Sequence, residues 1–315
     1  MDTAGQFDFP RSTSQRRTYR TCPTKYMHHY VGNWRPTTDR GTYAFGSVMQ
    51  DSLQMGLDLY AAARNAEPDA ILTLPNVAGI FREKWSPFEH DETRTWTSRA
   101  SWGQLNAWGQ RLITLALQEV VGVVDVSKPM LYEPKITFPM GDDTELALPD
   151  FIGWVMNTNG QPVPTILDWK TSDRAYEPLQ VELDDQLTDY QLAANRDPEI
   201  QQVLKGPIQQ VGLVVLIYGP NPRLQWLLTP ARTPEELASF EASAASVNRL
   251  IRQGVFYRNE RACFQMGKCP MIPLCYPSQR DQIATQLKQV AAHTPRSMPL
   301  LEAEKLARAE ARSEE

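Results

Sequence analysis

Two apolar, strand-like runs that carry charged residues constrain the fold of this chain more than any other feature. Residues 148–172 read LPDFIGWVMNTNGQPVPTILDWKTS. Asp150 lies near the start of the first run, and Asp168 and Lys170 lie near the end of the second. Charged groups inside buried strands cost free energy unless something pairs with them. The two runs therefore predict either a buried ion pair or a bound metal ion.

The spacing of these residues predicts how they face one another. Side chains two apart in a strand share a face, so Asp168 and Lys170 point one way while Leu167 and Trp169 point the other. The dipeptide at 159–160, Asn-Gly, is a hairpin turn signal. A hairpin centred on residue 159 places Asp150 directly opposite Asp168, with Cβ atoms about 5 Å apart. Prolines at 162 and 164 leave open a shift of this register by one or two residues.

Two carboxylates at that distance repel each other, and a cation between them resolves the conflict. Mg²⁺ or Mn²⁺ suits a site of few carboxylates completed by water and phosphate. Lys170 could hold a water molecule there or stabilise charge that develops on a phosphate. The alternative is a structural Asp168–Lys170 pair with Asp150 as a turn residue.

With 315 residues, of which 42% are hydrophobic, the chain can form one large domain or two small ones. It has no low-complexity linker and no internal repeat, so one domain is the simplest expectation. Patterns of apolar and turn residues predict a mixed α/β structure. Helices are expected over 22–31, 43–64, 102–121, 184–196 and 234–253, and strands over 135–140, 148–156, 165–171, 211–218 and 224–228.

Charge is distributed unevenly along the chain, whose net charge is −5. Residues 10–40 contain seven bases and one acid, whereas residues 141–190 contain eleven acids and two bases. A basic segment and a separate acidic pocket suit a protein that holds a polyanion against metal ions. Ordinary solvated faces are the alternative interpretation. The seven bases are Arg11, Arg16, Arg17, Arg20, Lys25, Arg35 and Arg40.

The N-terminus lacks the apolar core of a secretory signal, and no run reaches the roughly 18 apolar residues of a membrane span. We therefore expect an intracellular, cytoplasmic protein without a membrane partner.

Four motifs resemble those of one nuclease family. "PD" at 149–150 followed by "DWK" at 168–170 resembles the signature of the PD-(D/E)XK nucleases. "DDQLTDYQLAA" (184–194) resembles the Q-x-x-x-Y motif of their RecB-like branch. "YRTCPTKYMHHYV" (19–31) resembles the opening Cys-Pro helix of Cas4 and AddB-type nucleases, and "VFYRNERACFQMGKCPMIPLC" (255–275) resembles their closing cysteine cluster. The resemblance spans roughly residues 17–278, in the family's order.

The resemblance implies a restriction-endonuclease-like α/β core, with a mixed β-sheet flanked by helices. An N-terminal helical region and a C-terminal iron–sulfur segment would complete the fold. We expect a single nuclease domain over 15–292, between a flexible tail at 1–14 and a charged tail at 293–315. Within it, the helical part would span 15–125, the catalytic core 126–230, and the C-terminal helix with the cysteine cluster 231–280.

The resemblance also implies roles for the strand residues and the helix that follows them. Asp150, Asp168 and the backbone carbonyl of Trp169 would coordinate the catalytic Mg²⁺ or Mn²⁺, and Lys170 would be the catalytic lysine. Gln186 and Tyr190, one helical turn apart, would position that lysine or the DNA strand.

Two further residues are weaker candidates for the metal site. Glu133 lies where the family often places another acid, although a lone Glu at a strand start is more often solvated. Gln50 ends the stretch "GSVMQ", where the family commonly has a histidine ligand in G-x-x-x-H. A glutamine oxygen could approach the metal but is a weaker ligand for Mn²⁺ than imidazole.

The chain has four cysteines, Cys22, Cys263, Cys269 and Cys275. Structural disulfides are rare inside cells, and the spacing C-x5-C-x5-C does not match the common C-x-x-C zinc pattern. Four thiolates are what a [4Fe–4S] cluster requires, and free buried cysteines are the alternative. The resemblance implies such a cluster, which would join Cys22 to the distant trio and pin the basic N-terminal segment.

The function implied is a metal-dependent deoxyribonuclease that hydrolyses phosphodiester bonds with a water molecule activated by the metal. It would be an exonuclease on single-stranded DNA or DNA ends in recombination or repair, in a bacterial or phage-infected cell. It could act alone or with a recombination, helicase or annealing protein. The alternative function is a catalytically weak, Cas4-like DNA-end-binding or processing subunit of a larger complex.

Overall fold

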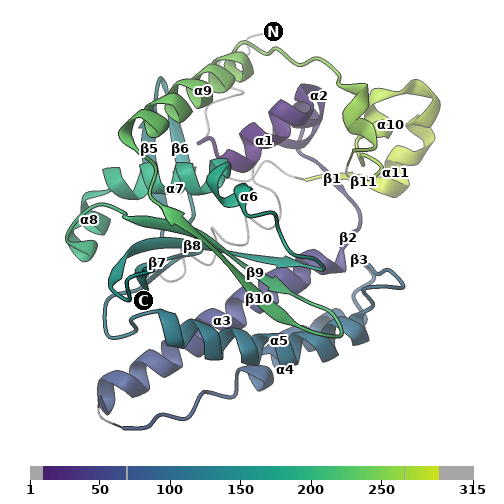
Figure 1. Cartoon of the computed structure of the whole chain (residues 1–315). Coiled ribbons are helices and arrows are strands. Elements are labelled where there is room, and N and C mark those ends of the chain that lie inside the picture. The colour runs from purple at the N-terminus through teal and green to yellow at the C-terminus, as the bar shows by residue number, and fades with distance from the viewer. Residues whose placement is uncertain (1–9, 69, 266, 291–315) are drawn as a thin grey trace. The chain divides into compact units, whose positions relative to one another are not determined.

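The computed structural model describes residues 10–68, 70–265 and 267–290, and these form two compact units (Figure 1). The sheet unit consists of residues 39–134 and 149–232. The cysteine unit consists, among the described residues, of 10–38, 135–148, 233–265 and 267–290. The predicted C-terminal tail at 293–315 and the first nine residues of the predicted N-terminal tail lie outside the described residues.

A five-stranded mixed sheet forms the centre of the sheet unit, in the order β10-β9-β8-β7-β4. β8 and β9 run parallel, and every other neighbouring pair is antiparallel. All residues of β9 are buried, as expected for an apolar, β-branched strand with neighbours on both edges. The strands are β4 (Leu131–Tyr132), β7 (Phe151–Met156), β8 (Pro162–Ser172), β9 (Gln210–Ile217) and β10 (Arg223–Pro230).

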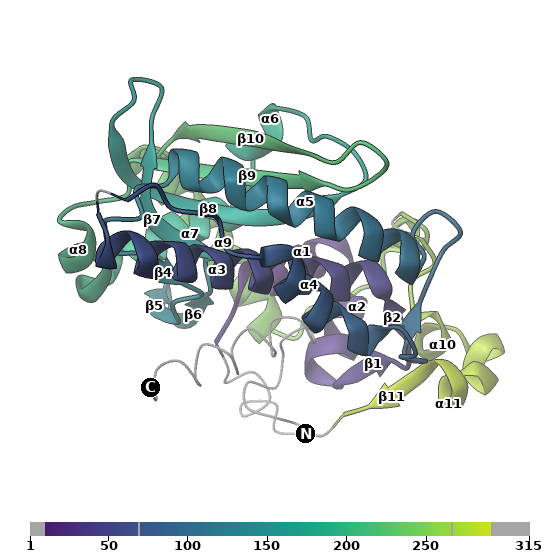
Figure 2. The ribbon, with the colours of Figure 1, turned by 90° about the horizontal axis from the view of Figure 1, so that it is seen from below.

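Helices flank this sheet, as the predicted fold class requires. α3 and α5 run along the sheet and pack on α4, while α7 contacts β8 and β9 (Figures 1 and 2). The helices are α3 (Gly41–Ala66), α4 (Val77–Trp85), η2 (Ser86–Phe88), α5 (Trp102–Val123), α6 (Leu179–Glu182), α7 (Asp185–Arg196) and α8 (Pro198–Leu204). A two-stranded pair, β2 (Asp39–Arg40) and β3 (Arg94–Thr95), completes the unit.

The β7–β8 hairpin has the register predicted from its turn. Phe151 pairs with Leu167 and Ile152 with Ile166, so the prolines of β8 do not shift the pairing. The same register brings Asp150, just before β7, level with Asp168 of β8. Leu167 and Trp169 belong to the main hydrophobic core, as their predicted face requires.

The cysteine unit combines helices with two short strand pairs. The strand predicted over 135–140 forms, but it pairs with β6 in a separate hairpin rather than in the five-stranded sheet. The helices are α1 (Thr13–Thr21), α2 (Pro23–Tyr26), η1 (Met27–Val31), α9 (Pro234–Arg252), η3 (Glu260–Cys263), α10 (Ile272–Cys275), η4 (Pro277–Gln282) and α11 (Ile283–Gln286). The strands are β1 (Trp34–Pro36), β5 (Ile136–Met140), β6 (Asp143–Ala147) and β11 (Leu287–Gln289).

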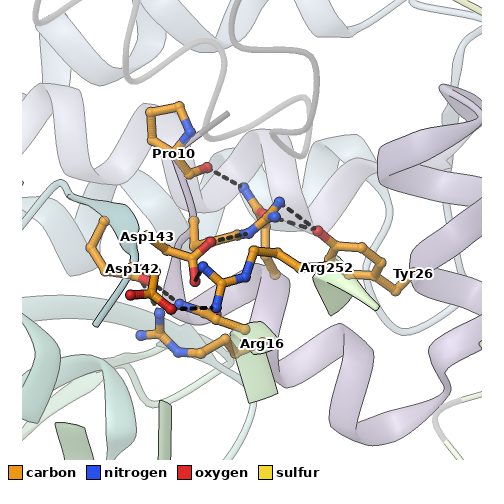
Figure 3. Close-up of polar contacts among 10 residues, drawn as sticks. Pro10, Arg16, Tyr26, Asp142, Asp143 and Arg252 are labelled. Atoms are coloured by element: carbon orange, nitrogen blue, oxygen red, sulfur yellow. Dashed lines mark hydrogen bonds and ion pairs between the residues drawn. The ribbon is translucent and has the colours of Figure 1, made fainter. Parts of the chain in front are cut away.

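Buried polar side chains hold α1, the β5–β6 hairpin and α9 together. Arg16 forms an ion pair with Glu145, which accepts a hydrogen bond from Asn248 at 2.8 Å. All three are at most 1% exposed. At the edge of this network, Arg252 lies between Asp142 and Asp143 (Figure 3).

Burial of basic residues limits both interpretations of the uneven charge. Arg11, Arg16 and Arg35, three of the seven bases in residues 10–40, are buried, so they neither face a polyanion nor form a solvated face. They serve the interior of the cysteine unit instead.

None of the helices among the described residues combines the length and the apolarity needed to cross a membrane.

Candidate active site and cysteine pocket

Three buried carboxylates lie around the first strands of the sheet unit. Glu133 follows β4, Asp150 immediately precedes β7, and Asp168 lies in β8, which pairs with β7. Their exposed fractions are 1%, 2% and 1%. Carboxylates are buried to this extent only where hydrogen bonds or cations compensate the lost hydration.

Asp150 is held by donors from two directions. One oxygen accepts the backbone N–H of Trp169 at 2.9 Å, which ties the strand end to β8. The other accepts the amide Nε2 of Gln50 at 3.1 Å, and the same nitrogen donates to Glu133 at 3.1 Å. Gln50 therefore reaches the predicted site, with its amide nitrogen rather than its oxygen toward the acids.

Glu133 adopts a backbone conformation that is rare for its residue type. Its φ of 46° lies in the left-handed region, which costs free energy for any residue other than glycine. Its backbone N–H faces the carbonyl of Asp150 at 3.4 Å. The expectation that a lone Glu here is more often solvated is wrong, because β4 carries Glu133 into the interior beside β7.

Lys170 connects the carboxylates to helix α7. Its Nζ lies 2.5 Å from Asp168 Oδ2 and donates to Gln186 Oε1 at 2.9 Å. Gln186 in turn donates from Nε2 to the hydroxyl of Tyr190 at 2.6 Å. Asp184 caps α7 and accepts the backbone N–H of Gln186, which fixes the first turn of the helix. The structure thus joins all four predicted residues, from Asp168 to Tyr190, in one chain of contacts.

The charge on Lys170 is set by opposing influences. Burial lowers its pKa, but attraction to Asp168 and Asp150, a hydrogen bond with Asp168 and attraction to Asp184 together leave the pKa raised above its usual value. The ammonium is therefore charged at neutral pH. Its side chain keeps 26% of its surface exposed, enough for contact with a ligand.

The four cysteines line one pocket of the cysteine unit. Cys22 lies between α1 and α2, Cys263 ends η3, Cys275 ends α10, and Cys269 lies in the loop between the latter two. Burial raises the pKa of Cys275 to about 11, with a further contribution from the other three thiols. Burial likewise raises the pKa of Cys269. Cys22, distant in the sequence, thus lines the same pocket as Cys263, Cys269 and Cys275.

Comparison with known proteins assigns the family. The model of the PD-(D/E)XK nuclease superfamily matches residues 10–276. The chain belongs to this superfamily. It is therefore a nuclease, an enzyme that hydrolyses phosphodiester bonds.

No curated protein matches this PD-(D/E)XK nuclease. A solved structure from Eubacterium rectale, described as a presumed exonuclease, is 11% identical, with 87% of this chain and 90% of that chain covered and a TM-score of 0.46. The structure of SSO0001 is 12% identical, with 65% and 87% covered and a TM-score of 0.26.

PD-(D/E)XK nucleases typically use Mg²⁺ or Mn²⁺, and the donors here suit such an ion. Glu133, Asp150 and Asp168 offer hard carboxylate oxygens, and buried carboxylates favour a nearby cation. As the side chains stand, the described residues contain no group of three or more His, Cys, Asp or Glu that could hold a metal ion. The fit therefore lies in the chemistry and burial of the donors.

Proposed function

We propose that this nuclease is a metal-dependent exonuclease that removes nucleotides from single-stranded DNA or DNA ends in recombination or repair. The observation that carries the proposal is the chain of contacts from Asp168 through Lys170 and Gln186 to Tyr190. Such a chain holds one ammonium group in place beside buried acids, an arrangement suited to developing phosphate charge.

Each residue of the site has a role in this proposal. Asp150, Asp168 and the carbonyl of Trp169 would hold Mg²⁺ or Mn²⁺, with Glu133 beside them. When bound, the ion would supply Lewis acidity toward a phosphoryl oxygen and would lower the pKa of water.

Lys170 donates hydrogen bonds from its charged amine to the phosphate oxygens or orients the attacking water. Gln186 and Tyr190 keep the amine in position. Gln50 reduces the repulsion between Asp150 and Glu133 by donating to both.

We also propose that the cysteine pocket holds a [4Fe–4S] cluster. Four sulfurs around one pocket supply the ligand number that this cluster needs. The cluster would link Cys22 to the segment of Cys263, Cys269 and Cys275, which supports a structural role. Iron and acid-labile sulfide, measured per chain, should fall when Cys269 is replaced by alanine. Because thiols must lose their protons to bind metal, reconstitution should also weaken at low pH.

The central experiment measures degradation of end-labelled single-stranded DNA with Mg²⁺ or Mn²⁺. Wild type should release nucleotides progressively, while Lys170→Ala should lose activity by about 10²-fold or more. Lys128→Ala is the matched control, because Lys128 pairs with Asp125 elsewhere in the same unit. The label position gives polarity, and circular single strands separate exonuclease from endonuclease action.

A second function is favoured by Gln50. If wild type and Lys170→Ala both bind DNA ends but neither cuts them, the amide in place of a histidine marks a weakened metal site. The protein would then be a Cas4-like end-binding or processing subunit of a larger complex.

A further inference from the structure

Two aromatic side chains are exposed on the segment that lines the cysteine pocket. Tyr257 is 61% exposed and Phe264 is 71% exposed. They lie seven positions apart in the sequence. The residues that directly follow them, Arg258 and Gln265, line the pocket. Single exposed apolar residues are common, but two large rings this close in one short segment favour a surface with a partner.

The same segment is basic, in contrast to the chain as a whole. Residues 255–275 contain Arg258, Arg261 and Lys268 but only one acid, Glu260. All three bases are exposed. Lys25 of α2 lines the same pocket and adds a further positive charge.

The backbone beside Tyr257 is held in place by the N-terminal helices. The carbonyl of Val255 accepts from the hydroxyl of Tyr19 at 2.6 Å, and the carbonyl of Tyr257 accepts from the backbone N–H of Thr24 at 3.1 Å. Asn259 donates from Nδ2 to the carbonyl of Thr21 at 2.8 Å. Tyr257 is therefore exposed to solvent on a segment whose backbone is held in place by hydrogen bonds.

Phe256 and Tyr257, neighbours in the anchored segment, differ in the direction of their side chains. The side chain of Phe256 packs against the buried rings of Tyr19 and Tyr26, with centroids 6.2 Å and 6.1 Å away. The neighbouring ring, Tyr257, faces outward instead. An apolar residue that is excluded from an adjacent core fits a role in binding better than a role in packing.

We propose that this aromatic–basic surface binds single-stranded nucleic acid. The surface is defined by Tyr257, Arg258, Arg261, Phe264 and Lys268. Aromatic rings stack on unpaired nucleobases, and the neighbouring arginine and lysine side chains neutralise the phosphates.

The composition of the surface favours this partner over a protein. Aromatic rings and arginines are also common in protein–protein interfaces, so the net positive charge of the segment, with Lys268 of a type depleted there, favours a phosphate-bearing partner. Rings can stack only on bases that are unpaired, which selects a single strand over a duplex. Because every base has a π face, binding should depend little on sequence.

This inference deepens the proposed function, since it names a contact for the DNA strand on a unit other than the one that carries Lys170. The inference concerns DNA binding rather than cleavage, so its test does not depend on whether the protein cleaves DNA. The probe is a fluorescein-labelled oligothymidine, and its anisotropy is measured with the full chain in EDTA, where metal-dependent cleavage is suppressed.

The aromatic residues are tested first. Tyr257→Ala and Phe264→Ala should each weaken binding about tenfold, within the range of losses for one stacked base. Phe264→Trp should keep near wild-type affinity, which separates a lost stacking ring from a disturbed fold. Tyr43→Ala, which removes a ring that is 51% exposed on α3, is the matched control.

The basic side chains are tested by the dependence of DNA affinity on salt concentration. Arg261→Ala combined with Lys268→Ala should reduce the slope of log affinity against log salt by about 1.4, the value for two phosphates of a single strand. Arg280→Ala combined with Lys288→Ala, two exposed bases of the same unit, should leave the slope unchanged.

An oligonucleotide with abasic sites completes the test. Wild type should bind it more weakly than oligothymidine, and the Tyr257→Ala/Phe264→Ala variant should bind both about equally. The proposal is overturned if wild type does not bind the single strand, or if the Tyr43 control loses as much affinity as the two aromatic variants. Binding is measured in EDTA and cleavage with the metal, so a failure of cleavage and a failure of this surface give different results.

Discussion

Gln50 lies beside two buried acids of the sheet unit, and its amide acts there as a hydrogen-bond donor. Its Nε2 donates to both Glu133 and Asp150, two buried acids whose like charges repel each other. Removal of the amide leaves two buried acceptors with fewer donors. Gln50→Ala should therefore lower the free energy of unfolding by about 1–3 kcal/mol in urea titrations.

Gln110→Ala is the control for this change, because among the described residues the Gln110 amide donates only to Asn106 on its own helix. We expect it to cost about 0.5 kcal/mol or less. Equal losses for the two glutamines would show that the bridge between the acids contributes nothing specific.

His29 makes the stability of the cysteine unit depend on pH. Burial, followed by the positive charges of Arg35 and Lys25, lowers its pKa to about 3. Below pH 6.5 the unfolded chain binds a proton that the folded chain excludes, so stability falls as the pH falls. Between pH 7 and pH 5 this group should contribute a loss of about 2 kcal/mol.

The measurement is the free energy of unfolding at pH 7 and at pH 5. His29→Gln should reduce the difference between the two values, whereas His90→Gln, on the exposed surface, should not. An unchanged pH dependence in His29→Gln would exclude His29 as its source.

Single residues also mark the limit of what the sequence predicts. Spacing alone placed Asp168 and Lys170 on one face, because side chains in a strand alternate with period two. Nothing local distinguished Glu133 from a solvated glutamate. Its burial depends on the pairing of β4 with β7, a contact between segments about 20 residues apart in the chain.

Helix α7 supplies the side chains that hold Lys170 in place. Gln186 and Tyr190 lie four residues apart, so both project from one face of the helix. Tyr190→Phe removes the hydroxyl that accepts from Gln186 and releases the amide that faces Lys170. We expect kcat for DNA cleavage to fall about threefold to tenfold, while DNA affinity in EDTA stays the same.

Tyr132→Phe is the matched control, since the Tyr132 hydroxyl donates to the sulfur of Met130. It should leave kcat unchanged. Tyr190→Phe with wild-type kcat, or with a loss that appears entirely as weaker binding, would contradict a positioning role.

The positions of the helices and strands were largely predictable from the sequence, whereas the pairing of the strands was only partly predictable. The Asn-Gly turn set the register of the β7–β8 hairpin, because a short loop leaves few ways to pair. The strand at 135–140 was also predicted, but its place in the β5–β6 hairpin was not. Gly141, at φ 63°, allows the tight turn through which β5 pairs with β6.

The two units are formed from interleaved segments of the chain. The cysteine unit combines the N-terminal helices, the β5–β6 hairpin and the segment from α9 onward. Local patterns predict helices and strands, but they do not predict which segments assemble. Buried groups from all three segments meet at Glu145, which pairs with Arg16 of α1 and accepts from Asn248 of α9.

Glu145 should therefore be essential to the assembly of this unit. Glu145→Gln leaves the buried guanidinium of Arg16 facing a neutral amide, which should cost about 3–5 kcal/mol of unfolding free energy. Asp142→Asn is the matched control, because the Asp142 side chain is 84% exposed in its pair with Arg252 and should contribute less than about 1 kcal/mol. Hydrogen exchange should increase in peptides from α1, β6 and α9 of the first variant only.

A double variant separates the cost of an isolated charge from the net value of the ion pair. Arg16→Met with Glu145→Leu replaces both charges by apolar side chains, and such replacements are often neutral or stabilising. It should recover most of the stability that Glu145→Gln loses. If instead the double variant remains as unstable as Glu145→Gln, the ion pair has a net stabilising value that apolar side chains do not replace, and its polar contacts specify the assembly of the three segments.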